Sequence, residues 1–138
     1  MAKQVITAAY LALGGTDLSS YTNSIELSVE ADEKDVTTFT SGGWKENIPG
    51  LRSGTLAIEF KQDVAASALD SIMWANFIGG SAVTFEVRVS NAVVGTSNPK
   101  YTGNVLVKEW TPIGGGVGDV AEVKVSFPTS GAVTRATA

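Results

Sequence analysis

A period of two in the hydrophobic residues constrains this chain more than any other feature. In four stretches apolar side chains alternate with polar or charged ones, namely residues 24–31, 55–61, 83–90 and 121–127. Successive side chains of a β-strand point to opposite faces of a sheet, so each stretch is predicted to be a strand with one buried and one hydrated face. The apolar faces need a second layer to cover them, which favours packed β-sheets.

Further strands are predicted with a weaker signal. Residues 5–13 form a first strand that ends at Gly14, and residues 101–110 form another. In the second of these the run Val105–Val107 interrupts the alternation, so both faces of that strand are expected to be covered. Short strands over 36–39 and 44–48 are compatible with the sequence.

One segment has helical rather than strand periodicity. Residues 64–78 contain neither glycine nor proline, Asp63 can cap their start, and the pair Gly79–Gly80 can end them. Trp74 and Ile78 fall on the opposite side of this helix from its apolar arc. The arc, at helical spacing, consists of Ala65, Ala68, Leu69, Ile72, Met73 and Phe77.

This order of elements predicts a mainly β fold, either a β-sandwich or a half-open β-barrel, with one packed α-helix at about residues 64–78. A length of 138 residues is that of one ordinary domain, and an apolar share of 43% is enough for a core. We expect a single domain over residues 1–127. Residues 128–138 lack periodicity and are expected to form a loose C-terminal tail.

The formal net charge of −4 is concentrated in one short stretch. Residues 26–35 hold five of the 14 acids and one of the 10 bases, so the remaining nine acids and nine bases cancel. This balance argues against a protein that binds nucleic acid by neutralising phosphates. The chain has no Cys and no His, which excludes disulfides, thiolate nucleophiles and mechanisms of the Ser-His-Asp or Cys-His type.

Polar clusters that could carry chemistry have simpler structural explanations. The glycine run 114–118 lacks the Lys-Ser/Thr end of a phosphate loop and is followed by Asp119, so a hairpin loop is favoured. The acidic stretch 30–35 could bind calcium, but it lacks the glycine and distal glutamate of an EF-hand loop, so a solvated loop is favoured. No catalytic, cofactor-binding or metal-binding residue is predicted. Three carboxylates with a base two residues on, which predicts neutral sheet surface, are Glu59, Glu86 and Glu122.

The tryptophans suggest where a partner binds. Trp110 lies at the end of a predicted strand and is expected in the core. Trp74 lies off the apolar arc of the helix, and Trp44 lies in a glycine-flanked loop, so both are expected to be exposed in the monomer. Exposed large aromatic side chains tend to mark an interaction surface.

Two neighbouring blocks give the chain a family likeness. They are NSIELSVEADEKDVTTF over residues 23–39 and GWKENIPGLRSGTL over residues 43–56, and the helix after the FKQD strand end adds to them. With these blocks the chain resembles the major tail tube proteins of long-tailed, siphovirus-type bacteriophages over nearly its whole length.

The resemblance implies a β-sandwich flanked by one helix, and hexameric rings that stack into a hollow tube of the virion tail after assembly in the host cytoplasm. The partners it implies are other copies of the chain, a tape-measure protein inside the tube, and tail terminator or tip proteins. DNA would pass through the lumen without specific binding. The resemblance implies no membrane, no cofactor and no catalytic residues.

Two sets of residues are expected to matter for assembly. The acidic face of the strand from residue 24 is expected to line the lumen, where like charge keeps DNA from sticking, although an outer solvated face is an open alternative. The candidates there are Glu26, Glu30 and Asp32.

The second set lies mainly in residues 32–51, a connection far longer than an ordinary hairpin loop of about 2–5 residues. This segment is expected to reach a neighbouring subunit, with a small hairpin folded onto its own domain as the alternative. The candidate contact residues, including one from the helix, are Val36, Phe39, Trp44, Ile48 and Trp74.

Other functions remain open at this point. One is a tube or connector component of a prophage-derived injection particle. Another is a carbohydrate-binding β-sandwich module that stacks sugars on Trp44 or Trp110. The weakest is a hydrolase that uses paired carboxylates.

Overall fold

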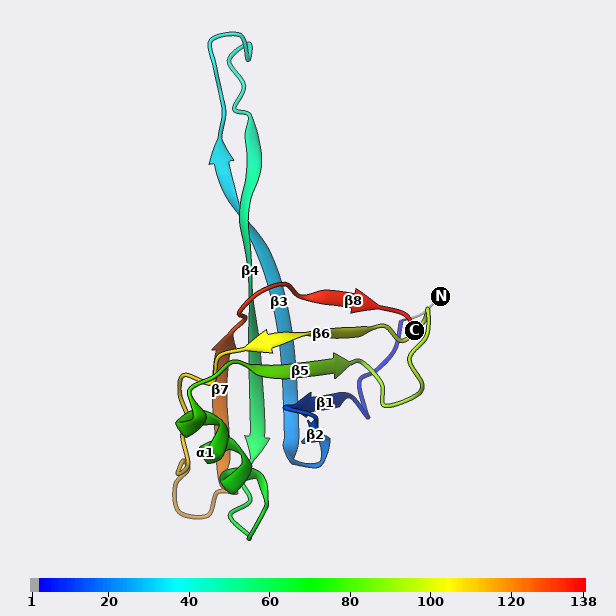
Figure 1. Cartoon of the computed structure of the whole chain (residues 1–138), viewed down its shortest axis with the longest axis vertical. Helices are drawn as coiled ribbons and strands as arrows, with labels where there is room; N and C mark the ends of the chain where they lie inside the picture. The colour runs from blue at the N-terminus through cyan, green and yellow to red at the C-terminus, as the bar shows by residue number, and fades with distance from the viewer. Residues whose placement is uncertain (1–2) are drawn as a thin grey trace.

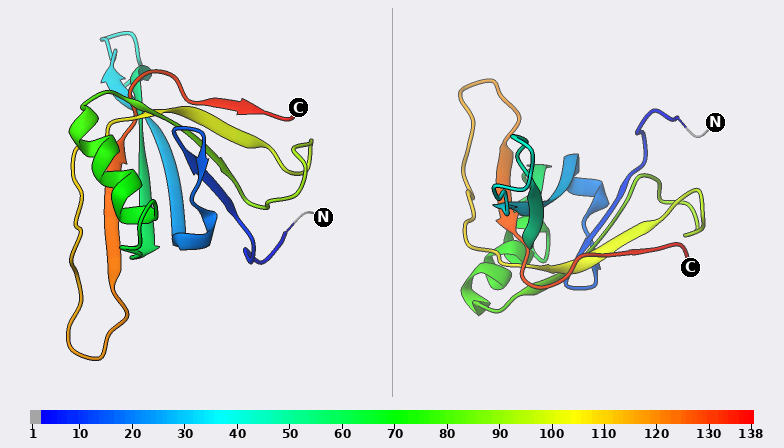
Figure 2. Two further views of the ribbon diagram at one scale, coloured as in Figure 1. Left: turned by 60° about the horizontal axis from the view of Figure 1, so that its bottom comes forward. Right: turned by 90° about the horizontal axis from the view of Figure 1, so that it is seen from above.

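A computed structural model describes residues 3–138 and shows two antiparallel sheets packed face to face, with one helix beside them (Figure 1). The strands of one sheet run across those of the other at a steep angle (Figures 1 and 2). The sheets are not closed into a barrel, so the sandwich prediction is confirmed. No helix of the described residues has the length and apolar character needed to span a membrane.

The larger sheet has the strand order β2-β1-β5-β6-β8 and the smaller has the order β3-β4-β7. Hydrogen-bonded neighbours in both sheets are antiparallel. The larger sheet consists of β1 (Tyr10–Leu13), β2 (Thr16–Asp17), β5 (Val83–Arg88), β6 (Lys100–Val105) and β8 (Thr134–Ala136). The smaller consists of β3 (Thr22–Asp35), β4 (Asn47–Lys61) and β7 (Glu122–Pro128), and the helix is α1 (Leu69–Gly79).

The core lies between the two sheets and is built by the predicted alternation. In the inner half of β4, in β5 and in β7 every second side chain is buried, and each large apolar side chain that is fully buried stabilises the fold by about 1.5–3 kcal/mol. From the smaller sheet the buried residues are Leu56, Ile58 and Phe60 of β4 with Val123, Val125 and Phe127 of β7. The larger sheet adds Leu11, Leu13, Phe85, Val87 and Val105, and the helix adds Leu69 and Met73.

The β3–β4 hairpin extends well beyond both sheets (Figure 1). Its pairing runs from Thr22 opposite Phe60 to Asp35 opposite Asn47, and the Val36 amide donates to the Glu46 carbonyl at 2.9 Å beyond that. We call residues 32–51 the arm. Residues 32–40 are all exposed, so the arm does not fold back onto its own domain. The short strands predicted over 36–39 and 44–48 are wrong in their bounds, because β3 ends at Asp35, β4 begins at Asn47, and residues 36–46 form the turn between them.

Gly54 marks the place where the hairpin leaves the sandwich. Its carbonyl accepts a hydrogen bond from the Thr129 amide at 3.0 Å as the chain crosses from β7 toward β8. A Cβ on Gly54 would lie 3.1 Å from the Ser28 carbonyl oxygen and 3.2 Å from the Thr129 side chain. A side chain at this position would crowd the β3 backbone and the Thr129 side chain, so glycine suits the close approach.

Two strand predictions need correction here. The first strand covers Tyr10–Leu13 and not residues 5–13, because its pairing with β5 ends at Tyr10 opposite Arg88 and leaves Val5 and Ile6 exposed. The strand predicted over 101–110 ends at Val105, and Val105 and Val107 are buried while Leu106 is exposed. The alternation is thus kept there, and only one face is covered.

The prediction of a loose tail over 128–138 also needs correction. Residues Thr134–Ala136 form β8, which pairs with β6 from Lys100 opposite Ala136 to Thr102 opposite Thr134. A strand of three residues at the edge of a sheet is held by backbone hydrogen bonds. It therefore gives no alternating pattern that the sequence could reveal.

The helix begins later than residue 64. The Asp63 carboxylate accepts from the Ala65 amide at 3.0 Å, which forms a turn and not a helix cap. Ser67 then adopts a left-handed φ of 59°, so helical structure starts only at Leu69 and Ala65 stays exposed. The predicted end is confirmed, since Gly80 has a φ of 69° and caps the helix in the left-handed conformation.

We expect Leu69→Ala to lower the free energy of unfolding by about 2–5 kcal/mol, because it empties space in a fully buried position of the core. Chemical denaturation of the unassembled protein measures this. Ile78→Ala on the exposed side of the same helix is the control and should change stability by no more than about 0.5 kcal/mol. Equal losses for both variants would mean that α1 does not pack as described.

Candidate assembly surfaces

The arm carries apolar side chains that its own domain does not cover. Phe39 at the tip is fully exposed, and Trp44 is 79% exposed. Val36, Ile48 and Leu51 are exposed as well. Single exposed apolar residues are ordinary on a protein surface, but a set gathered on one projecting hairpin makes the arm a candidate interaction surface.

The tip of the arm is held in shape by its own hydrogen bonds. The Asp35 carboxylate accepts from the Thr37 amide at 2.8 Å, and the Thr37 hydroxyl accepts from the Glu46 amide at 2.8 Å. The Ser41 hydroxyl accepts from the Thr38 amide at 3.0 Å. The Thr37 hydroxyl and, after it, the Thr37 amide hold the pKa of the Asp35 carboxyl below its ordinary value. The tip is thus a turn held in shape by hydrogen bonds within the arm.

The outer face of the smaller sheet is mostly neutralised by cross-strand ion pairs. Lys61 pairs with Glu122 and holds the pKa of that carboxyl below its ordinary value, and Lys124 lies 3.6 Å from Glu59. Of the predicted pairs two residues apart, Glu86 with Arg88 forms, at 3.1 Å, whereas Glu59 and Glu122 pair with bases on neighbouring strands.

Glu26 and Glu30 lie on this same outer face and take part in none of the ion pairs found among residues 3–138. Both are exposed. Asp32 is exposed too and stands at the base of the arm, opposite a two-residue bulge formed by Gly50 and Leu51. The three candidate lumen residues therefore follow one another up one side of β3.

The acidic stretch and the glycine run do not form the calcium site or the phosphate loop considered for them. In residues 3–138 no group of three or more His, Cys, Asp or Glu side chains is arranged to hold a metal ion. The acidic stretch 30–35 belongs to a strand, so its carboxylates point alternately to opposite faces. In the glycine run 114–118, the Asp119 carboxylate accepts from the Gly116 amide at 3.0 Å, and a phosphate would be repelled there.

The three tryptophans differ in their surroundings. Trp110 packs edge-on against Phe60 at 6.0 Å, and its ring N–H donates to the Asp70 carboxylate at 3.1 Å, so it belongs to the edge of the core. Trp74 is 50% exposed on the outer side of α1, with Phe77 at 5.7 Å. Only Trp44 and Trp74 offer a ring to a partner.

A cleft of about 1430 Å³ opens between the inner face of β3 and the far end of the larger sheet. Sequence reasoning missed it, because its walls come from strands far apart in the chain. Its apolar lining includes Ile25, Leu27, Val29, Val87, Tyr101 and Val133. Its charged lining residues are Arg52, Arg88 and Arg135.

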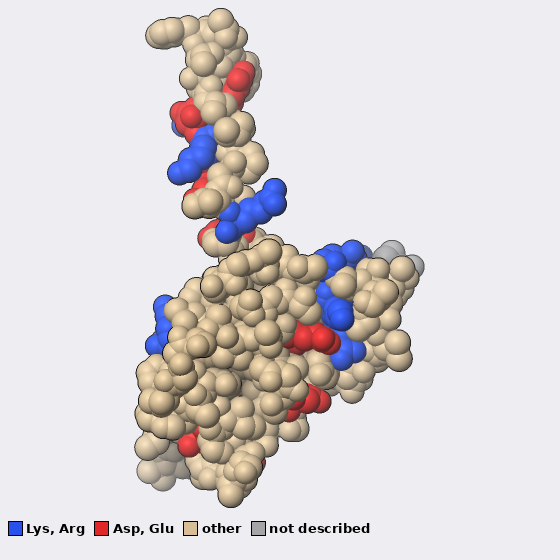
Figure 3. Space-filling view, in the orientation of Figure 1, with Lys and Arg blue, Asp and Glu red and all other residues tan. Residues whose placement is uncertain are grey.

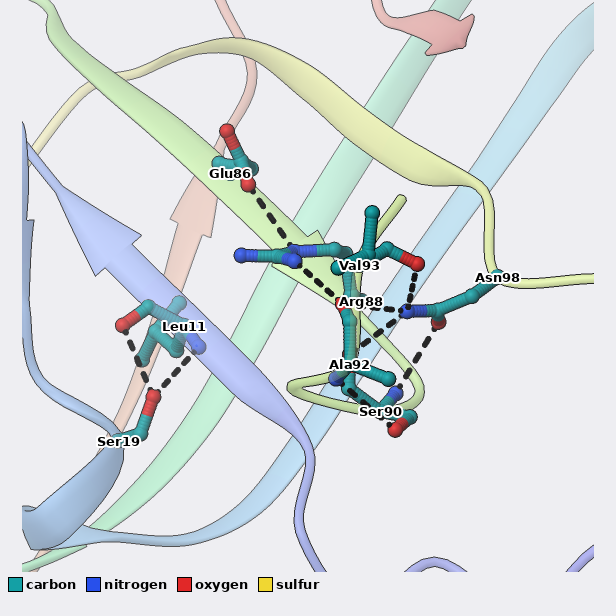
Figure 4. A network of polar contacts seen from close by, with 8 residues as sticks. All are labelled: Leu11, Ser19, Glu86, Arg88, Ser90, Ala92, Val93 and Asn98. Atoms are coloured by element: carbon teal, nitrogen blue, oxygen red, sulfur yellow. Dashed lines mark hydrogen bonds and ion pairs between the residues drawn. The ribbon is translucent and has the colours of Figure 1, made fainter. Parts of the chain in front are cut away.

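One rim of the cleft is held by a polar network (Figure 4). The Asn98 side-chain amide is buried and donates to the carbonyls of Ser90 and Ala92, each at 3.0 Å. The Arg88 guanidinium lies over the Tyr10 ring at 4.0 Å and donates to the Ala92 carbonyl at 2.8 Å. In the space-filling view, basic side chains gather at this end of the larger sheet (Figure 3).

Comparison with known proteins shows where this chain belongs. A family model for the phage tail tube protein matches residues 21–135. The chain belongs to the phage tail tube protein family. No curated protein sequence matches it significantly. Membership in this family makes it a structural component of a virion tail.

Two solved structures resemble this tail tube protein in fold. One is described as the virion of a native gene transfer agent particle, with a TM-score of 0.77 and 19% identity over 96% of this chain and 98% of that one. The other is the tail of an empty gene transfer agent particle with C6 symmetry, with a TM-score of 0.72 and 20% identity over 92% of each chain. At this identity the likeness concerns the fold alone.

The order of the tip in this tail tube protein can be tested through Asp35. Its pKa, measured by NMR titration, should lie below the ordinary value for aspartate, and Thr37→Val should raise it by removing the hydroxyl. A lowered folded-state pKa means that the contact stabilises the tip at neutral pH and is lost as the pH falls through that pKa. An unshifted pKa that ignores Thr37→Val would contradict the ordered turn.

Proposed function

We propose that this tail tube protein forms rings of six subunits that stack into a hollow tube, and that the arm joins each subunit to a neighbouring copy. The observation that supports this most directly is the ordered, projecting arm with uncovered Phe39 and Trp44. The C6 symmetry of one gene transfer agent tail supports the number of subunits.

A tube needs contacts that do not close on themselves. When one surface of a subunit binds a different surface of the next, the contact can repeat without end along an axis. The arm extends beyond its own sandwich and can present its apolar side chains only to another molecule. Burial of Phe39, Trp44 and Ile48 against a neighbour would supply the hydrophobic part of such a contact.

The other proposed partners follow from the family. The tube would enclose a tape-measure protein, end at tail terminator or tip proteins, and let DNA pass without specific binding. The proposed role is structural and needs no catalytic residue. A tube component of a prophage-derived injection particle is a second candidate, favoured by the likeness to gene transfer agent tails.

Deletion of Thr38–Glu46, with a short Gly-Ser turn in their place, tests the arm. It removes the tip and leaves β3 and β4 intact, so we expect a folded monomer that no longer polymerises. Electron microscopy and circular dichroism measure assembly and folding. Val117→Ser, which changes a fully exposed apolar residue in another loop, is the control and should assemble normally. Normal tubes from the deletion variant would refute the role of the arm.

The outer side of α1 is proposed as a second contact between subunits. Trp74 is half exposed there, so Trp74→Ala should weaken assembly more than it weakens the folding of the monomer. Sedimentation of tubes and denaturation of the monomer provide the two measurements. If the variant lost both to the same extent, Trp74 would be part of the core and not of a contact.

We propose that Glu26 and Glu30 face the lumen, and that Asp32, the third acidic candidate, stands at the base of the arm where this acidic wall passes into the contact with a neighbouring copy. Glu26 and Glu30 are acidic groups left over on an otherwise neutralised sheet face, and a negative wall keeps DNA moving by repulsion. Because the chain has no cysteine, Glu26→Cys places a single thiol at this site. A bulky maleimide should label it in the monomer but not in the tube. Full labelling of assembled tubes would place this face on the outer wall.

A further inference from the structure

We propose that the arginine-lined cleft is the receptor for the arm of a neighbouring copy, an inference that rests on the tube-forming function proposed above. The cleft is larger than the about 300–1,000 Å³ of ordinary small-molecule pockets, which suits a polypeptide segment. The arm is a polypeptide segment that projects away from its own domain. The occupant is a second copy of this chain.

Charge complementarity supports this pairing. Arg52 and Arg135 line the cleft and take part in none of the ion pairs found among residues 3–138, whereas Arg88, also in the lining, is paired with Glu86. No Asp or Glu of the described residues lines the cleft. The strand that enters the arm carries the acidic run 32–35, in which only Lys34 is basic. Opposite potentials on two surfaces fix which surfaces meet and speed their encounter.

The apolar parts match as well. Ile25 and Leu27 are only half-buried and Val29 is 62% exposed, although all three lie on the core side of β3. They form an apolar floor that the larger sheet leaves open. The arm brings the complementary apolar groups, among them Val36 and Ile48. One occupant would thus provide both carboxylates for the arginines and apolar side chains for the floor of the cleft.

The receptor is already ordered before anything binds. Asn98 holds the rim loop through the carbonyls of Ser90 and Ala92, and Tyr10 together with Glu86 fixes the Arg88 guanidinium (Figure 4). The Arg135 Nε, on β8, donates to the Tyr101 hydroxyl, on the neighbouring strand β6, at 3.3 Å. A site whose side chains are held in place loses little conformational entropy when it binds.

The geometry also explains why such a contact would repeat. The floor of the cleft is the part of β3 that continues into the same molecule's arm, and Arg52 lies on β4 at its root. An arm that docks at the root of the next arm leaves that next arm free to dock in turn. This is an open, head-to-tail series, which is the arrangement that a growing tube requires.

Cross-linking of cysteines tests the pairing in a chain that has none of its own. Thr40→Cys lies at the tip of the arm and Asn91→Cys on the cleft rim, and both positions are exposed. With a flexible bismaleimide, this double variant should give a ladder of covalent oligomers. The matched control pairs Thr40→Cys with Ser126→Cys on the outer face of the smaller sheet, and it should give no ladder.

Charge reversal tests the electrostatic part. Arg52→Glu with Arg135→Glu should raise the protein concentration needed for assembly by roughly tenfold, and so should Asp32→Lys with Glu33→Lys. The four changes together should restore assembly, because the attraction is re-established with opposite signs. Asp35 is left unchanged because it holds the tip.

The outcomes separate this inference from the proposed function. The receptor is elsewhere, and the arm keeps its role, if the tip deletion blocks assembly but the Thr40→Cys, Asn91→Cys double variant gives no ladder. The same conclusion follows if the tip deletion blocks assembly but the four charge changes together do not restore it. Tubes from the tip deletion would overturn both. If Arg52→Glu with Arg135→Glu assembles normally but loses an affinity of the monomer for short DNA, the cleft binds phosphate and the inference is overturned.

Discussion

Backbone pairing between β3 and β4 is the interaction on which the other features of this molecule depend. It runs from Thr22 opposite Phe60 to Asp35 opposite Asn47 and is longer than the sandwich that it helps to form. Inside the sandwich, β7 pairs with β4, and the apolar side chains of both strands are buried against the larger sheet. Beyond Gly54, the same two strands continue with only each other as partners. A single hairpin is therefore both half of a core and a free arm.

This dual use leaves β3 with two different faces. The inner face carries Leu27 and Val29, which the larger sheet covers only in part, and the incomplete cover opens the cleft. The outer face carries Glu26 and Glu30 beside cross-strand ion pairs that cancel the other charges. The same pleat that separates apolar from polar residues in any half-buried strand thus separates the surface proposed for docking from the acidic face proposed for the lumen.

The parts that the sequence predicted are those set by local periodicity. Alternation identified the buried residues of β4 and β7, and the glycines after residue 78 identified the end of α1, because each signal lies within a few residues. The predicted start of α1 was wrong because Ser67 adopts a left-handed conformation, which a serine in the sequence does not signal. The length of the connection 32–51 predicted a reaching segment, but where the arm leaves the sandwich depends on Thr129 crossing Gly54. The cleft unites Arg52, Arg88 and Arg135 from three strands, so it leaves no local signal.

The acidic run on β3 also bears on which contacts are avoided. A long exposed hairpin has unpaired strand edges, and such edges can pair with one another and aggregate. Two arms that approached each other would bring Asp32, Glu33 and Asp35 against the same residues of another copy, and like charges in that position repel. An arm that approaches the arginine-lined cleft meets the opposite charge instead. The charge pattern therefore opposes arm-to-arm pairing and favours the one orientation that can propagate, and because exposed charges are screened, this discrimination should weaken as salt is raised.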